Sequence, residues 1–423
     1  MLPARTEERP DALALFKEEY YRKLIQDYDL RVKPGTQHYG VRYLYYHEPD
    51  NTLLVSHSWG SRVHLINLST GSIRYYDFHK QTVRMILVHN NEIITASWDG
   101  TVRVVDYFTL KERLRLSDPE MGRSPCATVR ESGDSLIAFC YDSDKKPECR
   151  SNKVRLWSLS EGLLKMIYHE TGEHRASMRS GYCLNHGSNL YVISNSGYLN
   201  VFRLGSGRMV SSTFLALNLR AMCIHPSRKL IIVGDETGMI YVCRLDPVFI
   251  LFSIKGHHFD ISEIRMHDSR EDIIITIAFD GRIKFWKLPS FTCECEIVCG
   301  NSMLWTQTMR KDLVFAGSDE GDIWIWDIHD LPNYRLKGRM RVFSDSILVR
   351  QDDSKYFYSN DISNLELLEK DKQEPISGKP AEYLLHSFNK ESVLNEVFRS
   401  DQELKEQKPN AEKLVAQLPQ SIS

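Results

Sequence analysis

Three cysteines, Cys293, Cys295 and Cys299, have the spacing that first suggests chemistry, because neighbouring thiolates can bind a metal ion. On an extended strand, residues two apart share a face, but residues four apart lie about 13 Å from each other along the chain. Three such ligands are poorly placed around one ion. We therefore expect buried or half-buried thiols here and predict no metal site.

The sequence lacks the patterns typical of a catalytic centre. It has no Gly-x-Ser-x-Gly elbow, no His-Glu-x-x-His zinc motif and no glycine-rich phosphate-binding loop. The segment 169–180, HETGEHRASMRS, is mildly basic, but its two arginines and its histidines are a thin basis for binding phosphates. We expect a protein that is not an enzyme and that uses no cofactor.

Composition and charge narrow the class of partner. The 423 residues are 42% hydrophobic and 26% charged, with 54 basic and 56 acidic side chains and a net charge of −2. Nucleic acid and anionic membranes usually require a clear basic excess, so we expect neither as the main partner.

No uncharged apolar run reaches the ~18 residues of a membrane helix, and the first residues do not resemble a secretory signal. The nine scattered cysteines are typical of reduced thiols. These features predict a cytoplasmic protein without membrane insertion, with the nucleus as the alternative.

A repeat of about forty residues organises most of the chain. Each copy has a short apolar run, a turn of small residues and a second alternating run, and period-two alternation indicates strands. The turn residue and the residue six positions later align at Gly60/Ile66, Asp99/Val105, Ser151/Trp157, Ser196/Phe202, Thr237/Cys243, Asp280/Trp286 and Glu320/Trp326. The second members are spaced by 39, 52, 45, 41, 43 and 40 residues, and a charged insertion at 140–153 explains the one long interval.

Three of these copies resemble the ends of WD40 repeats: ITASWDGTVRVVDY (94–107), FDGRIKFWKL (279–288) and GSDEGDIWIWDI (317–328). The resemblance spans about residues 38–330 and implies an all-β fold, a WD40-type β-propeller with seven blades, eight being the alternative. For the sixth repeat it also implies a structural hydrogen-bond network, formed by His257, Thr276, Asp280 and Trp286.

The flanks of the repeat region have their own patterns. Residues 1–37 are predicted to form an arm, with a helix over 10–28 and a strand at 30–33 that could complete the blade containing Trp326. The propeller is expected over 38–340. Residues 341–369 would form either a partial eighth blade or a hairpin laid over the ring.

A linker and tail follow at 370–423. Short helical patterns occur in 381–423, where Ser400 and Glu403 have the spacing of a capping box. The helix 10–28 and the tail 381–423 are candidate secondary docking elements for a partner.

Large aromatic residues recur just before the turn position of the repeat. They are Trp59, Trp98 and Phe279, and the resemblance places this turn on the top rim of a propeller. Three aromatic side chains on one arc would suit a protein-binding hot spot, with Glu236 and Asp319 as an acidic flank. The alternative is that each ring packs inwards against a neighbouring loop.

These observations favour a non-catalytic scaffold that binds other proteins or peptides in an intracellular multiprotein complex. A substrate receptor or regulatory subunit of an enzyme complex, such as a ubiquitin ligase, is the alternative function. Some WD-repeat receptors of that class carry Trp-Asp-x-Arg, whereas this chain has Trp326-Asp327-Ile328-His329, so that docking route loses support.

Overall fold

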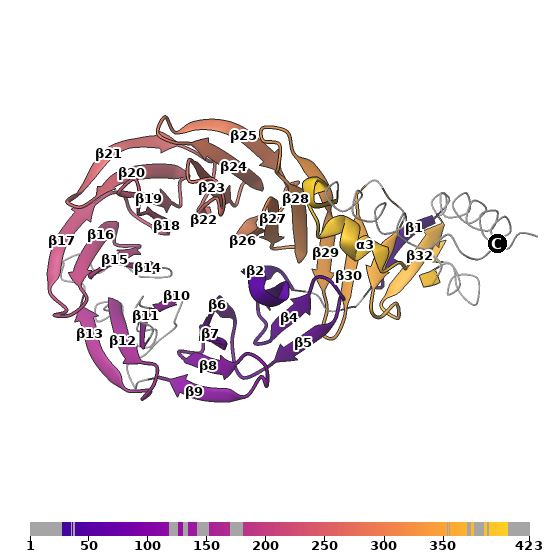
Figure 1. The fold of residues 1–423 in the computed structure, drawn as a ribbon, viewed down its shortest axis with the longest axis horizontal. Helices are drawn as coiled ribbons and strands as arrows, with labels where there is room; N and C mark the ends of the chain where they lie inside the picture. Colours follow the sequence, from indigo (N-terminus) through magenta and orange to yellow (C-terminus); the bar gives the residue numbers. More distant parts are fainter. Residues whose placement is uncertain are drawn as a thin grey trace, which may run out of the picture.

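In the computed structural model, seven antiparallel sheets stand side by side in a closed ring, as the blades of a β-propeller (Figure 1). The seven predicted blades are confirmed. The residues that the structure describes are 28–34, 36, 39–117, 126–129, 134–141, 152–169, 181–352, 354, 356–369, 374–375, 385–386 and 389–404.

Each of the first six blades is a four-stranded sheet whose strands follow one another from the inside of the ring to the outside (Figure 1). Blades one to three are β2 (Val41–His47), β3 (Thr52–His57), β4 (Val63–Asn67) and β5 (Ile73–Tyr76); β6 (Val83–His89), β7 (Glu92–Ser97), β8 (Val102–Asp106) and β9 (Glu112–Leu116); β10 (Cys126–Val129), β11 (Ser135–Tyr141), β12 (Asn152–Ser158) and β13 (Leu164–His169). Blades four to six are β14 (Gly181–His186), β15 (Asn189–Ser194), β16 (Tyr198–Arg203) and β17 (Met209–Phe214); β18 (Leu219–His225), β19 (Leu230–Asp235), β20 (Met239–Leu245) and β21 (Val248–Lys255); β22 (Ile261–Met266), β23 (Ile273–Ala278), β24 (Arg282–Lys287) and β25 (Thr292–Val298).

The seventh sheet has six strands, because two more strands extend its outer edge. They are β26 (Leu304–Arg310), β27 (Leu313–Ser318), β28 (Asp322–Asp327), β29 (Arg335–Val342), β30 (Ile347–Gln351) and β31 (Phe357–Ser359). A separate small sheet is formed by β1 (Tyr28–Val32), β32 (Leu365–Glu369) and β33 (Glu374–Pro375), and the short helices are η1 (Glu48–Asp50) and α3 (Ser392–Val397).

The repeat pattern maps directly onto the blades. The second member of every aligned pair, from Ile66 to Trp326, lies in the third strand of its blade and is buried. In six of the seven blades, the register against the fourth strand shifts at this same residue. A bulge increases the local twist of a strand pair, so its repetition gives the outer strands a common bend. The apolar residues of neighbouring blades share the hydrophobic clusters between them. One such cluster contains Ile275 and Phe285 of blade six and Val314 and Trp326 of blade seven.

The first and seventh blades meet without sharing a strand, and we call this contact the seam. All four strands of blade one come from the continuous stretch 41–76, and those of blade seven follow from Leu304 onwards. The hydroxyls of Thr306 and Thr308 accept hydrogen bonds from the amides of Leu44 (3.1 Å) and Tyr46 (3.2 Å). A Cβ on Gly317 would lie 2.5 Å from Val41, so the two blades approach too closely for a larger residue there.

The N-terminal strand does not close the last blade, in contrast to the prediction from the sequence. Strand β1 pairs with β32, with Leu30 opposite Leu367, because β29 and β30 already occupy the outer part of the seventh sheet. The predicted helix over 10–28 lies outside the described residues except for Tyr28, which begins β1.

Residues 341–369 form neither an eighth blade nor a hairpin over the ring. Strands β30 and β31 pair in order beyond β29, and β32 joins the small sheet beside them. The segment therefore lengthens the seventh blade outwards (Figure 1).

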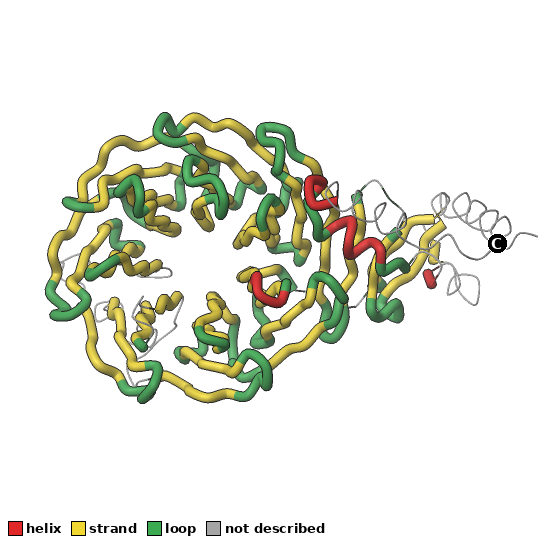
Figure 2. Tube along the Cα trace, in the orientation of Figure 1, coloured by secondary structure: helices red, strands yellow, loops and turns green. Residues whose placement is uncertain are grey.

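The C-terminal segment packs against the seam. Val393, Leu394 and Val397 of α3 lie in one hydrophobic cluster with residues of the first and seventh blades, and Figure 2 shows α3 crossing the outer part of blade seven. The capping box is present, since Glu403 N–H donates to Ser400 Oγ at 3.2 Å and Ser400 N–H donates to Glu403 Oε2 at 3.0 Å. Burial opposes ionisation of Glu403, but hydrogen bonds from Lys311 and Arg310 outweigh it and lower its pKa to about 2.

A buried chain of hydrogen bonds crosses blade six. Trp286 Nε1 donates to Thr276 Oγ1 at 2.8 Å, and that oxygen lies 2.7 Å from His257 Nε2. His257 Nδ1 lies 3.1 Å from Asp280, and burial lowers the pKa of the imidazole. A neutral ring with its proton on Nδ1 satisfies every group, because Nε2 then accepts the threonine hydroxyl proton.

Blade two has the shorter form of this chain. His79 bridges Thr95 (2.8 Å) and Asp99 (3.0 Å), and Val105 stands at the position of Trp286. The first contacts are alike, but the indole donor is missing.

The two blades offer a matched pair of variants. Thr276→Val removes the partner of both His257 and Trp286, whereas Thr95→Val removes the partner of His79 without stranding an indole. Each stranded buried group costs about 1–3 kcal/mol, so we expect Thr276→Val to lower the free energy of unfolding by about 1 kcal/mol more than Thr95→Val. Urea unfolding followed by tryptophan fluorescence measures both, and equal losses would show that the indole bond contributes nothing.

Candidate interaction surface at the inner rim

The predicted rim residues are held by a repeated backbone hydrogen bond. The amide of the turn residue after the second strand donates to a carbonyl that precedes the first strand of the same blade. This bond joins Trp98 to Thr82 (3.0 Å), Glu236 to Asn218 (3.1 Å), Phe279 to Asp260 (2.9 Å) and Asp319 to Met303 (3.0 Å). Four of the five predicted residues are therefore structurally equivalent.

Trp59 differs from the other four. In blade one, the equivalent bond runs from Ser58 N–H to Gly40 O at 2.7 Å, so Trp59 stands one position later. Its φ of +61° turns the backbone, and its side chain is 84% exposed. The amide of Trp59 donates to Thr82 Oγ1 at 3.0 Å, which ties its turn to the one that carries Trp98.

A second bulge explains how further side chains reach the rim. At the start of the first strand in five blades, one residue is skipped in the register with the second strand. The skipped residues are Arg42, Arg84, Arg220, Ser262 and Trp305. Bulges re-aim side chains, and the first strands are the innermost of the ring (Figure 1). An alignment of the repeats on the start of this strand, each time after an apolar residue, would have found these positions.

Three of the skipped residues join two predicted ones in a cluster, which we call the inner rim cluster. Its members are Arg42, Arg84, Trp98, Phe279 and Trp305. The rings of Phe279 and Trp305 meet edge to face with centroids 4.2 Å apart. The guanidinium of Arg42 lies 3.6 Å from the Trp305 centroid and 5.8 Å from that of Trp98, and Arg84 lies 5.1 Å from Trp98. These contacts connect blades six, seven, one and two.

The cluster combines flat apolar surface with positive charge. Trp98, Phe279 and Trp305 are half-buried, so each ring is fixed on one side and reachable on the other. A guanidinium group stacked on a ring gains about 0.5–2 kcal/mol. Arg42 is only 7% exposed and Arg84 is half-buried, so the two arginines hold the rings in place and the outer ring faces are the surface that a partner can reach. This surface suits an apolar or aromatic side chain of a partner.

The acidic flank is partly neutralised. Glu236 lies 3.3 Å from Arg220, which also lies 3.4 Å from Asp260. Burial raises the pKa of Asp260 despite that contact. Asp319 differs, because its Oδ1 is enclosed without a hydrogen-bond partner among the described residues.

The exposed Trp59 borders a separate pocket of about 260 Å³ between blade one and the extension of blade seven. His57 and His64 line it, with ring centroids 5.2 Å apart. Burial lowers the pKa of His57 to about 3 and that of His64 to about 4, so both rings are neutral at neutral pH.

The described residues form neither a metal cluster nor a membrane-spanning helix. Among the described residues, no three His, Cys, Asp or Glu side chains are grouped to hold a metal ion. Cys295 and Cys299 lie in the core between blades six and seven, while Cys293 is exposed. Within the same part of the chain, no helix is long and apolar enough to cross a membrane.

Comparisons with known proteins agree with the repeat pattern. No protein-family model matches the chain. The pre-rRNA-processing protein crb3/ipi3 of Schizosaccharomyces pombe is 23% identical over 246 residues, which are 56% of this chain and 53% of that protein. The U3 small nucleolar RNA-associated protein 13 of Saccharomyces cerevisiae is 23% identical over 163 residues, or 38% of this chain and 19% of that protein. The match thus spans about half of the first relative and a fifth of the second.

The designed protein Ika8 supports the fold. Its crystal structure matches with a TM-score of 0.56 at 17% identity, over 75% of this chain and 95% of that one. The buried His–Thr–Asp sets of blades two and six agree with the resemblance of the forty-residue repeat to WD40 repeats. The chain is a seven-bladed β-propeller. In this propeller, the rim turns that carry Trp98 and Phe279 directly follow the threonine strands of those two blades.

The neutral histidines of the propeller predict a pH effect. An unfolded histidine binds a proton near pH 6.5, whereas folded His57 does so only near pH 3. The unfolded chain therefore binds more protons between these values, and stability must fall as pH decreases below about 6.5.

We expect His57→Gln to remove about 2 kcal/mol of the difference in unfolding free energy between about pH 7 and pH 5. Urea titrations at the two pH values measure it. His258→Gln, at an exposed side chain, is the matched control and should leave the difference as it is in the parent chain. An unchanged pH dependence in His57→Gln would show that folding does not lower the pKa of His57.

Proposed function

We propose that this propeller is a non-catalytic interaction subunit of a multiprotein complex that acts in pre-rRNA processing. The observation that carries the proposal is the inner rim cluster, where half-buried aromatic rings and two guanidinium groups from four blades lie together. Aromatic residues and arginines are the side chains most enriched at protein-binding hot spots.

The partner is proposed to bind across the top rim. An apolar or aromatic side chain of the partner would contact the outer faces of Trp98 and Phe279, which the arginines hold in place. Trp59 would supply a second anchor on the neighbouring turn, with Glu236 and Asp319 on the acidic flank.

The names of the relatives support the process and the compartment. One is named for pre-rRNA processing and the other for association with a small nucleolar RNA. Of the two expected locations, the nucleus is therefore the one we propose. Direct RNA binding is not part of the proposal, since the net charge is −2.

Affinity purification of the tagged full chain with mass spectrometry tests this function. We expect wild type to recover pre-rRNA-processing proteins, and Trp98→Ala and Trp305→Ala each to reduce their recovery at least tenfold, because a hot-spot aromatic contributes about 2 kcal/mol. Trp59→Ala tests the second anchor. Phe108→Ala is the matched control, as Phe108 is 65% exposed on the turn between β8 and β9.

Three outcomes would contradict parts of the proposal. Unchanged recovery in both Trp98→Ala and Trp305→Ala would exclude the inner rim cluster as the binding site. Loss of all partners after ribonuclease treatment would show an association through RNA. Recovery of ubiquitin-ligase core subunits in place of processing factors would support the alternative function, a substrate receptor.

A further inference from the structure

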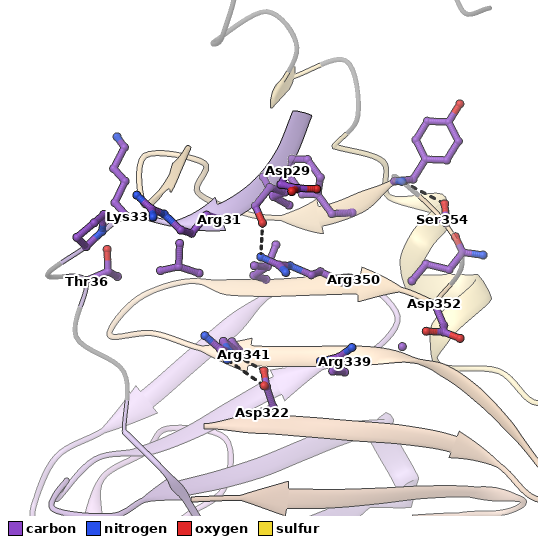
Figure 3. Close-up of a pocket in the computed structure, with 18 residues that line it drawn as sticks. Asp29, Arg31, Lys33, Thr36, Asp322, Arg339, Arg341, Arg350, Asp352 and Ser354 are labelled. Atoms are coloured by element: carbon purple, nitrogen blue, oxygen red, sulfur yellow. Dashed lines mark hydrogen bonds and ion pairs between the residues drawn. The ribbon is translucent and has the colours of Figure 1, made fainter. Parts of the chain in front are cut away.

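A cleft of about 640 Å³ lies outside the ring, between β1 and the outer strands of the seventh sheet (Figure 3). Its floor is formed by β28, β29 and β30, and β1 forms its wall. These elements lie at the outer edge of the molecule, whereas the inner rim cluster lies at the innermost strands (Figure 1). The proposed function uses none of these residues.

Three arginines share the floor of the cleft. Arg339 stands directly opposite Arg350 on β30 and opposite Trp324 on β28, and Arg341 follows two residues later on the same face. Like charges placed directly opposite each other on a sheet are destabilising. The facing pair of Arg339 and Arg350 therefore destabilises the sheet at this position, and a bound anion would remove that repulsion.

The arginines differ in their partners. Arg341 makes two hydrogen bonds to Asp322, at 2.6 and 2.9 Å. The guanidinium of Arg339 lies 4.3 Å from the Trp324 ring centroid, and Arg350 Nη2 donates to the carbonyl of Leu30 at 3.0 Å. Neither Arg339 nor Arg350 is paired with a carboxylate within the described part of the chain.

The positive charge of the lining is concentrated on its floor. The lining contains five cationic side chains (Arg31, Lys33, Arg339, Arg341, Arg350) and three carboxylates (Asp29, Asp322, Asp352). Arg31 is paired with Glu366 at 2.6 Å and Arg341 with Asp322, which leaves Arg339 and Arg350 as the floor cations without a carboxylate partner among the described residues. Burial lowers the pKa of Arg350, and the charges of Arg341 and Arg339 lower it further. An anionic ligand would reverse that effect.

The wall is an open strand edge. The small sheet has the order β1-β32-β33, so among the described strands β1 pairs on one side only. Lys33 N–H donates to Asn364 O at 2.9 Å, and antiparallel strands alternate the direction of their polar groups. The backbone N–H and C=O groups of Asp29, Arg31 and Lys33 therefore point towards β32. Those of Leu30 and Val32 point the other way, towards the cleft. The bond from Arg350 to the Leu30 carbonyl agrees with this direction.

We propose that the cleft binds an extended acidic peptide segment, which adds to the open edge of β1 as a further strand and places its carboxylates on Arg339 and Arg350. Main-chain hydrogen bonds to an exposed strand edge are an established mode of peptide recognition. Alternate side chains of the added strand would face the floor, and carboxylates suit the planar donors of arginine.

The strand edge of β1 and the carboxylates of the lining favour a peptide over a nucleic acid as the ligand of the cleft. Leu30 and Val32 present donors and acceptors at the spacing of a polypeptide strand, which a sugar–phosphate chain does not match. The carboxylates of Asp29, Asp322 and Asp352 also lie in the lining and would repel closely spaced phosphates.

Fluorescence anisotropy with the full chain tests the proposal. The probe is a labelled peptide of alternating Glu and Val, as long as β1. We expect saturable binding that weakens about tenfold in Arg339→Ala, which keeps the contact between Arg350 and β1, and more in the double variant Arg339→Ala/Arg350→Ala. Arg208→Ala, at an exposed arginine of blade four, is the matched control and should bind as wild type.

A second probe separates strand addition from simple charge attraction. The same peptide with alternate amides N-methylated keeps its carboxylates but loses donors to β1, so we expect it to bind at least tenfold more weakly. Equal binding of the methylated peptide, or no effect of Arg339→Ala, overturns the proposal. Tighter, Arg339-dependent binding of a single-stranded oligoribonucleotide also overturns it and assigns the cleft to RNA.

Discussion

The contact between β2 and β26 is the constraint on which the ring depends. Among the described strands none is exchanged across the seam. The first blade is held by side chains of the seventh, through the hydroxyls of Thr306 and Thr308 on its backbone and through a shared apolar cluster. These contacts join residues 262 positions apart in the sequence, so the loop that they close is long and its entropy must be offset locally.

Arg310 links the parts that meet at the seam. Its Nε donates to Asn51 Oδ1 of the first blade at 3.0 Å, and its Nη1 donates to the carbonyl of Phe398 at 2.9 Å and to Glu403 at 2.8 Å. One side chain of blade seven therefore contacts both blade one and the C-terminal segment. The C-terminal segment thus takes the stabilising role that an exchanged strand would otherwise have. The outer strands of blade seven also provide the floor of the outer cleft.

The sequence was sufficient for the repeating part of the fold but not for its closure. Each blade must bury its own apolar strand residues, so every blade has the same alternation and spacing. The pattern from Ile66 to Trp326 therefore predicts seven blades and the position of each third strand. The pairing of residues 30–33 could not be predicted in the same way, because the outer edge of the seventh sheet is occupied by β29 and β30. That pairing depends on contacts between distant segments, which no local pattern indicates.

The candidate site was predicted in part for a similar reason. Trp98 and Phe279 follow from the turn position, but Trp305, Arg42 and Arg84 reach them only because a bulge shifts the inner strand. Trp59 was aligned one residue from its structural equivalent, since its blade lacks the buried turn aspartate that fixes the alignment in blades two and six.

The inner bulge has a consequence for how such a surface can diversify. A residue that is skipped by the strand register makes no ladder pair with the second strand, so its side chain is not held to the apolar packing of its neighbours. Within this one chain the position already holds arginine, serine and tryptophan, while the adjoining residues Val41, Val83, Leu219, Ile261 and Leu304 stay apolar and buried. The skipped residue of the first strand thus varies from blade to blade, while the residue before it is kept for the core. A new contact surface could arise by changing the skipped residue while the preceding apolar residue stays the same.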